Sequence, residues 1–173
     1  DLPAKSVTEF VALAKSKPGG LNYGSSGVGA PLHLAMEMLK HAAGIDIVHV
    51  PYRGDALLYA ALVSGEIEFA VVPQSTGLPH IKSGSIRALG VTGTRRSPVL
   101  PEVPTVAEAG VSGLETRSWN GLFAPAQTPR DVVLTIQKAT AAALAAPEVR
   151  DRILGMGQDP VGNTPEEFDA FFK

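Results

Sequence analysis

The chain has 173 residues, of which 45% are hydrophobic and 18% are charged, and its formal net charge is −2. These proportions are those of an ordinary globular protein and exclude a disordered or fibrous chain. Acidic and basic residues are interspersed and no apolar run approaches the roughly 18 residues that span a bilayer, so the composition excludes a nucleic-acid surface and a membrane-spanning helix.

The first predicted helix begins after Ser6, which forms a capping box with Glu9, and it ends at Pro18. A short strand follows at residues 21–23. This strand runs into a turn rich in Gly and Ser over residues 24–30, so the chain opens with a helix, a strand and a glycine-rich turn.

A second helix is predicted from Pro31 to about Ala43, because Pro suits the first helical position and apolar residues recur on one helical face. Residues 47–50 form a short segment rich in β-branched side chains, which predicts a second strand. After a turn, a helix is expected over residues 56–64, with Asp55 as its N-cap.

Residues 67–72 form a near-continuous apolar run, typical of a strand with both faces covered, and residues 86–91 predict another strand. Strand, turn and helix alternate at a spacing that favours an α/β fold with a mostly parallel sheet. The remainder of the chain is helical in pattern, with helices expected to begin at Thr128, Pro147 and Thr164.

The pattern changes near residues 115–124, which predicts a boundary between residues 1–117 and residues 118–173. The helices of the second part have apolar faces and no strand of their own to cover. Three aromatic residues at helical spacing near the end are core contacts or, alternatively, a partner surface: Phe168, Phe171 and Phe172.

The turn before Pro31 is the most informative candidate site. A strand that feeds a glycine-rich turn into a helix directs backbone N–H groups and the positive helix end toward one spot, which suits an anion. Ser25 and Ser26 add hydroxyl donors. The alternative interpretation is that the glycines only form a tight turn between strand and helix.

A second candidate lies at the carboxyl end of the next strand, where open α/β sheets bind ligands. Tyr52, Arg53 and Gly54 occupy this position. Arg53 either meets a carboxylate or is a solvated loop charge, and the sequence leaves both interpretations open.

Enzymatic sites are not supported by the spacing of the reactive residues. Gly24 and Gly27 enclose two serines, which is the wrong spacing for a hydrolase nucleophile turn. His33 and Glu37 lie four residues apart on one helix, but two ligands are short of a metal site. We therefore expect no enzyme activity, no metal and no cofactor.

An ordered set of short motifs runs through nearly the whole chain. The motifs are Leu21-Asn22-Tyr23-Gly24-Ser25-Ser26-Gly27, His33-Leu34-Ala35, Val48-His49-Val50-Pro51-Tyr52-Arg53-Gly54, Leu78-Pro79-His80-Ile81, Arg87-Ala88-Leu89-Gly90-Val91-Thr92, Leu100-Pro101-Glu102-Val103-Pro104-Thr105 and Gly121-Leu122-Phe123-Ala124-Pro125. Together they resemble the solute-binding receptors of tripartite tricarboxylate transporters, the Bug-type family.

The resemblance implies a periplasmic-binding-protein-like fold of two lobes that close like a Venus flytrap on a small carboxylate, without metal or cofactor. Residues 1–117 would be the second lobe, and residues 118–173 would be the hinge crossing and the helical C-terminal part of an incomplete first lobe. We expect a fragment that lacks the N-terminal part of the first lobe and its signal peptide, and whose exposed tail helices allow self-association.

The same resemblance implies a periplasmic protein that delivers its ligand to the membrane components of a transporter. The absence of cysteine reflects either chance or such an oxidising compartment. An alternative that the sequence does not separate is a ligand-dependent partner of a signalling receptor, because both roles use the same cleft.

The ligand-binding positions that the resemblance implies, together with neighbouring residues at the same strand ends, are Ser25, Ser26, Gly27, Gly29, Ala30, Tyr52, Arg53, Gly54, Val72 and Pro73. Two departures from the family pattern concern the ligand. Ala30 and Pro31 stand where relatives often have small hydroxyl residues, and Val72 followed by Pro73 stands where they often have an acidic residue. This favours a less polar carboxylate without an ammonium group.

Overall fold

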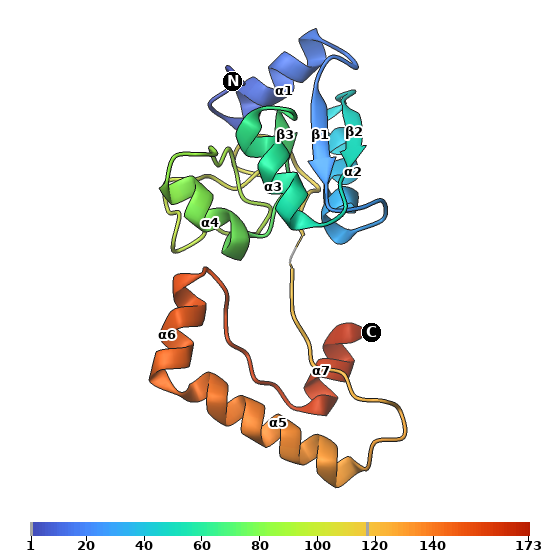
Figure 1. Cartoon of the computed structure of the whole chain (residues 1–173), viewed down its shortest axis with the longest axis vertical. Helices are drawn as coiled ribbons and strands as arrows, with labels where there is room; N and C mark the ends of the chain where they lie inside the picture. The colour runs from blue at the N-terminus through green and yellow to red at the C-terminus, as the bar shows by residue number, and fades with distance from the viewer. Residues whose placement is uncertain (1, 117) are drawn as a thin grey trace. The chain divides into compact units, whose positions relative to one another are not determined.

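The structure is a computed structural model that describes residues 2–116 and 118–173, and it divides into two compact units (Figure 1). One unit ends at Ser118 and the other spans Trp119–Lys173. The assignment of the units to two lobes of a receptor stays a prediction.

The first unit alternates helices and strands, as the sequence pattern predicts. Its elements are α1 (Val7–Ser16), β1 (Asn22–Ser25), α2 (Pro31–Ala43), β2 (Val48–Pro51), α3 (Asp55–Ser64), β3 (Phe69–Ala70) and α4 (Gln74–Lys82). The α/β fold class is confirmed by this alternation and by a sheet in which both strand pairs are parallel.

The three-stranded sheet has the order β2-β1-β3, so β1 is its middle strand. Tyr23 of β1 lies opposite His49 of β2 and Phe69 of β3. Because all three strands run in the same direction, their carboxyl ends meet at one edge of the sheet. The segments that follow the strands therefore start close together at that edge.

Helices cover both faces of this sheet. Tyr23 points into the larger core with Phe10 of α1 and Met36 of α2, and all three side chains are fully buried. The next residue, Gly24, faces the opposite side, where Leu58 of α3 and Ile67 form a second core. The alternation along β1 thus buries one residue on each side.

Helix α2 has the predicted bounds, and the N-cap of α3 is a correction. Gly54, not Asp55, is the N-cap of α3, and Asp55 is the first helical residue. The cap has a φ of 99°, a conformation that glycine adopts without strain and other residues avoid. Asp55 remains in the first turn, where its negative charge interacts favourably with the positive N-terminal end of the helix.

Two predicted strands are shorter or missing in the described residues. Only Phe69 and Ala70 of the run 67–72 are strand, and residues 86–91 form a single parallel bridge, between Val91 and Thr105. β-branched residues make a strand only where a neighbouring strand pairs with them, and the sequence pattern does not show which neighbours are present.

The second unit contains α5 (Arg130–Ala145), α6 (Pro147–Gly155) and α7 (Pro165–Phe172). Thr164 forms the predicted capping box with Glu167 at the start of α7, and an ion pair between Arg130 and Glu166 joins α5 to α7. None of these three helices has a buried residue.

Within residues 2–116 and 118–173, no single helix is long and apolar enough to cross a membrane. Helices α5 and α6 meet those criteria only when joined, and they are bent by 74° at their junction.

Candidate functional site

The candidate site is the edge of the first unit where the three parallel strands end. Ser25 and Pro51 are paired at the ends of β1 and β2, and the N–H of Tyr52 donates to the carbonyl of Ser25. Strand β3 ends at Ala70, opposite Gly24, and leads through residues 71–73 into α4. The fold thus brings together the backbone of the turn at 25–30 with the segments that contain the other predicted site residues.

The turn that follows β1 is open to solvent on its outer side. Val28 and Gly29 are exposed, and Ser26, Gly27 and Ala30 are half-buried. Gly29 has a φ of 78°, so a residue other than glycine would be strained there. The turn therefore presents backbone rather than bulky side chains at the surface, except for Val28.

Two helices begin at this edge without a negative charge in their first turn. Ala30 is the N-cap of α2 and Pro73 is the N-cap of α4, and neither cap provides a side-chain hydrogen bond. The other helices, α1, α3, α5, α6 and α7, each have an acidic residue in the first turn. The positive ends of α2 and α4 are consequently not neutralised by an acidic residue of their own first turn.

Ser25 is a buried residue whose hydroxyl is engaged within the protein. Its side chain is 1% exposed, and its Oγ lies 2.7 Å from Nε2 of His49. The same Oγ donates to the carbonyl of Gly27 at 3.0 Å and accepts from the N–H of Gly27 at 3.3 Å. Ser25 therefore holds the turn from its inner side.

A stack of rings lies beneath the turn. The ring centroid of His49 is 4.2 Å from that of His33 and 4.8 Å from that of Tyr23. Nδ1 of His33 accepts a hydrogen bond from the N–H of Gly29 at 3.2 Å. Burial lowers the pKa of His49, and the neighbouring His33 and Lys40 lower it further, whereas Glu37 opposes the shift. His49 is accordingly neutral at neutral pH.

The stack is anchored by a polar chain. The hydroxyl of Tyr23 donates to Glu37, which also pairs with Lys40 at 2.8 Å. These hydrogen bonds, that to Lys40 first, lower the pKa of Glu37. Burial, together with the bond to Glu37, raises the pKa of Tyr23 far above its usual value. Glu37 is therefore an ionised partner of Tyr23 and Lys40 rather than a metal ligand.

The second predicted cluster is Tyr52, Arg53 and Gly54, and its side chains do not all lie at the same place. The ring of Tyr52 packs against the core formed by Leu58 and Ile67, and its hydroxyl donates to Glu66 at 2.9 Å. Arg53 is exposed, whereas Gly54, Val72 and Pro73 are half-buried. Tyr52 thus contributes its backbone to the edge of the sheet, while its phenol points back along the sheet.

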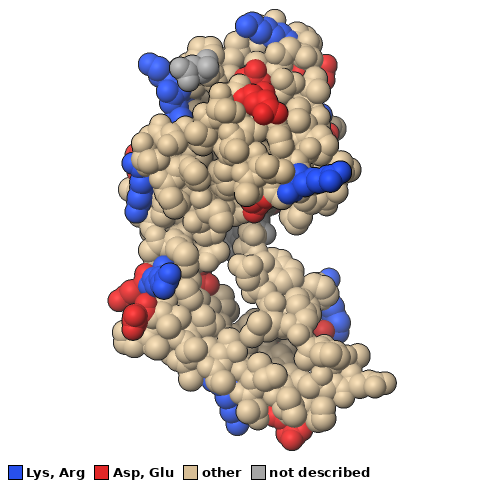
Figure 2. Space-filling view, in the orientation of Figure 1, with Lys and Arg blue, Asp and Glu red and all other residues tan. Residues whose placement is uncertain are grey.

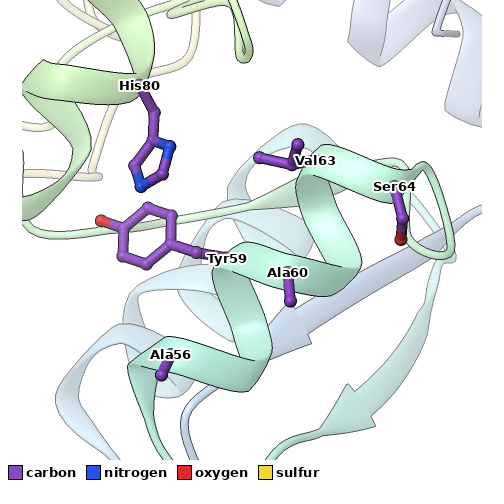
Figure 3. A pocket seen from close by; sticks show the side chains of 6 residues that line it. All are labelled: Ala56, Tyr59, Ala60, Val63, Ser64 and His80. Atoms are coloured by element: carbon purple, nitrogen blue, oxygen red, sulfur yellow. The ribbon is translucent and has the colours of Figure 1, made fainter.

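A hollow of about 470 Å³ lies elsewhere on this unit, between α3 and α4 (Figure 3). Its six lining residues include Tyr59 and His80, whose rings stack at 4.8 Å, and contain no Lys or Arg. In Figure 2, the charged side chains stand in small separate groups over the face in view. The described lining of the hollow therefore offers no permanently positive side chain to an anion.

Three residues near the edge were not identified from the sequence as parts of a site. For His33 the sequence offers only Glu37 as a second metal ligand, and for His49 it shows no matching spacing; no group of three or more possible metal ligands occurs in the described residues. Gln74 is the first residue of α4, and its Nε2 is buried without a hydrogen-bond partner. In the sequence, only the position of Gln74 directly after Val72 and Pro73 indicates a donor at this edge.

Comparisons with known proteins match the chain along its length. The family model described as "Tripartite tricarboxylate transporter family receptor" matches residues 1–172. A protein from Pseudomonas sp. (strain P51), described as a UPF0065 protein in the tcbD-tcbE intergenic region, is 38% identical over 170 residues. That match covers 98% of this chain and 51% of the relative, so the chain spans about half of the relative's length.

Solved structures of the same kind superpose closely. The R. palustris protein Rpa4515 with adipate has a TM-score of 0.94 at 34% identity, and the match covers 99% of this chain and 57% of the other. The periplasmic binding protein BugD has a TM-score of 0.92 at 31% identity, covering 99% and 58%. MatC from Rhodopseudomonas palustris with bound malate has a TM-score of 0.85 at 30% identity, covering 95% and 55%.

Proposed function

Because this chain belongs to the family of tripartite tricarboxylate transporter receptors, we propose that its protein captures a small carboxylate in the periplasm and delivers it to the membrane components of such a transporter. The family is one of solute-binding receptors rather than enzymes. Two similar structures contain adipate and malate, which are both dicarboxylates. BugD, whose structure is similar, is a periplasmic binding protein, and this supports the proposed location in the periplasm.

One observation carries the proposed site. Two helices, α2 and α4, begin at the same sheet edge, and both lack an acidic residue in the first turn. A carboxylate at this edge would accept hydrogen bonds from unpaired N–H groups, and two positive helix ends would stabilise its charge. The turn residues Ser25, Ser26, Gly27, Gly29 and Ala30 form the centre of this proposed site.

The remaining proposed residues surround that centre. The backbone of Tyr52 and Gly54 and the exposed guanidinium of Arg53 follow β2, and Val72 with Pro73 precedes α4. Neither Val72 nor Pro73 provides a carboxylate to pair with a ligand ammonium. The proposed ligand is therefore a carboxylate without an amino group.

We assign the unit up to Ser118 to one lobe of the receptor and the unit from Trp119 to the hinge crossing and the C-terminal part of the other lobe. The second unit supports this because its three helices have no buried residue and no strand in the described part of the chain. An apolar helix face without a partner is normally covered by another layer of structure.

Isothermal titration calorimetry on the full-length protein tests the proposal. With adipate, malate and L-aspartate as probes, we expect at least one of the first two to bind with a Kd of about 1 μM, which corresponds to about −8 kcal/mol. We expect L-aspartate to bind more weakly than malate, because its ammonium has no carboxylate partner at Val72. Absence of binding by every dicarboxylate in a wider series would contradict the proposed function.

Ala30→Asp tests the position of the site. Ala30 has the extended backbone of an N-cap, with φ −61° and ψ 150°, and Asp is a good N-cap, so folding is preserved or improved. A negative charge at this position repels a bound carboxylate, and we expect affinity to fall by at least about tenfold. Ala30→Asn is the matched control, because it caps equally without charge. Equal affinities of the two variants would place the ligand elsewhere.

A further inference from the structure

The hydrogen bonds of Ser25 bear on which ring nitrogen of His49 has the proton. A serine hydroxyl has one proton to donate and two lone pairs that accept. The carbonyl of Gly27 takes the proton of Ser25, and the N–H of Gly27 uses one lone pair. With the proton of Ser25 on this carbonyl, Nε2 of His49 is the donor in the contact of 2.7 Å, so His49 has its proton on Nε2.

This arrangement leaves Ser25 with no proton for a ligand. All three contacts of its Oγ are made inside the protein, and the side chain is 1% exposed. The peptide N–H groups of Ser26 and Val28, by contrast, have no hydrogen-bond partner in the part of the chain that the structure describes. Donors for an anion are thus backbone groups of the turn, while Ser25 fixes their direction.

We propose that His49 is a positioning residue of the carboxylate site: its Nε2–H holds Ser25, and Ser25 holds the Gly27 peptide so that the free N–H groups of the turn face the ligand. This inference rests on the proposed function for its ligand and adds a residue that lies one strand away. His49 acts through Ser25 and does not touch the ligand.

The surroundings of His49 favour this role. Its ring is held between β1 and α2 by contacts with Tyr23 and His33, with centroids 4.8 Å and 4.2 Å away. His33 in turn accepts the N–H of Gly29. The turn is therefore fixed at two peptides, at Gly27 through Ser25 and at Gly29 through His33, and the stacked rings connect the two attachments.

Two substitutions separate the hydrogen bond from the packing. His49→Phe keeps an aromatic ring in the stack and removes the donor. His49→Gln loses the ring but places an amide Nε2–H close to the position of the imidazole Nε2–H. A packing role predicts that Phe preserves the site and Gln damages it, whereas the positioning role predicts the reverse.

The first readout needs no ligand. Amide hydrogen exchange of Gly27, measured by NMR on the ligand-free full-length protein, is expected to accelerate about tenfold in His49→Phe, the effect of one lost hydrogen bond, and to return toward the wild-type rate in His49→Gln. Unchanged exchange in His49→Phe, or faster exchange in His49→Gln than in His49→Phe, overturns the proposal.

The second readout is the affinity for adipate and malate by calorimetry. We expect His49→Phe and Ser25→Ala each to weaken binding about tenfold, and the double variant to be no weaker than either, because both remove the same connection. Additive losses would mean that Ser25 contacts the ligand directly, and would overturn the proposed route through Ser25.

The two readouts separate this inference from the proposed function. If wild-type protein binds neither these dicarboxylates nor others, the proposed function fails, and the ligand-dependent half of the inference fails with it. The amide hydrogen exchange rate of Gly27 alone then still tests whether His49 fixes the turn. If exchange responds as expected but affinity does not, the turn is not the ligand site, and the positioning role is overturned.

Discussion

At the scale of single residues, Tyr23 connects the interior of the first unit to its charged surface. Its ring is fully buried, and its hydroxyl donates to Glu37, which pairs with Lys40. Burial and this hydrogen bond favour the neutral phenol, so the pKa of Tyr23 in the folded protein lies above the ordinary value of 10.0. The protein must therefore lose stability in alkali as the unfolded chain ionises.

The variant Tyr23→Phe tests whether the raised pKa of Tyr23 makes the protein lose stability as pH rises. A raised pKa contributes stability that is complete below pH 10.0 and is lost as pH rises above it, because the unfolded phenol ionises and the folded one does not. The free energy of unfolding from urea titrations should fall more steeply above pH 10.0 in wild type than in Tyr23→Phe. Tyr52 and Tyr59 also have raised pKa values, but both proteins contain them. Parallel pH profiles would contradict this role of Tyr23.

The sequence predicted the turn as a candidate site but not the role of each residue in it. The sequence predicts Ser25 as a hydroxyl donor for an anion at the glycine-rich turn. Its actual partner, His49, lies 24 residues further along the chain and meets it only because β1 and β2 pair in parallel. Local motifs contain no information about such a pairing, so the sequence predicts only a satisfied or surface histidine at His49 and not its contact with Ser25.

At the scale of elements, the contact between α3 and β1 depends on the missing side chain of Gly24. A Cβ at Gly24 would lie 2.4 Å from Cδ1 of Ile67 and 2.5 Å from Cδ1 of Leu58. Such distances are shorter than any real carbon contact, so the ends of the Ile67 and Leu58 side chains would have to shift, or α3 would have to move away from the sheet. The close approach of helix and strand therefore requires glycine at this position.

Gly24→Ala is expected to lower the free energy of unfolding by about 1–3 kcal/mol, the usual cost of overpacking a core. Urea unfolding monitored by circular dichroism measures the loss. Ile67→Val removes one of the two clashing methyl groups and provides the control background, in which the same substitution should cost less. An equal cost in both backgrounds would mean that the strain arises elsewhere than at Ile67.

Helices and strands differed in how well the sequence predicted them, for a physical reason. The bounds of α2 depend on Pro31, which begins it, and on Gly44, which ends it in a left-handed conformation, and both signals are local. Residues 86–91 are as apolar as a strand but form only the bridge from Val91 to Thr105. A strand exists only where a neighbour completes its hydrogen bonds, and that information is distant in the sequence.

At the scale of the whole molecule, the second unit has an apolar surface. An aromatic cluster in this unit has rings that contact one another edge to face, tilted or stacked, and it consists of Trp119, Phe123, Phe168, Phe171 and Phe172. Phe171 and Phe172 are 61% and 58% exposed. The sequence left open whether these phenylalanines are core contacts or a partner surface, and the exposure of Phe171 and Phe172 favours the second interpretation. Contiguous apolar surface of this kind usually marks a site of interaction.

The 173-residue polypeptide is accordingly expected to self-associate through this aromatic cluster. Sedimentation velocity over a range of concentrations should show dimers or larger species, and the double substitution Phe171→Asp and Phe172→Asp should return the chain to monomer. Leu57→Asp, at a residue of α3 that is 53% exposed, is the control and should leave the association unchanged. A concentration-independent monomer would remove the basis for this prediction.

The central position of β1 in the sheet also makes the candidate site depend on two separate strand pairings. The turn after Ser25 reaches its observed geometry only when β2 has docked on one side of β1 and β3 on the other, although their paired residues are far apart in the chain. A molecule that has assembled only one of these pairings lacks either His49 beneath the turn or the helix that follows β3. If the proposed function holds, a molecule that has formed only one of the two strand pairings would therefore lack part of the site and bind its ligand weakly.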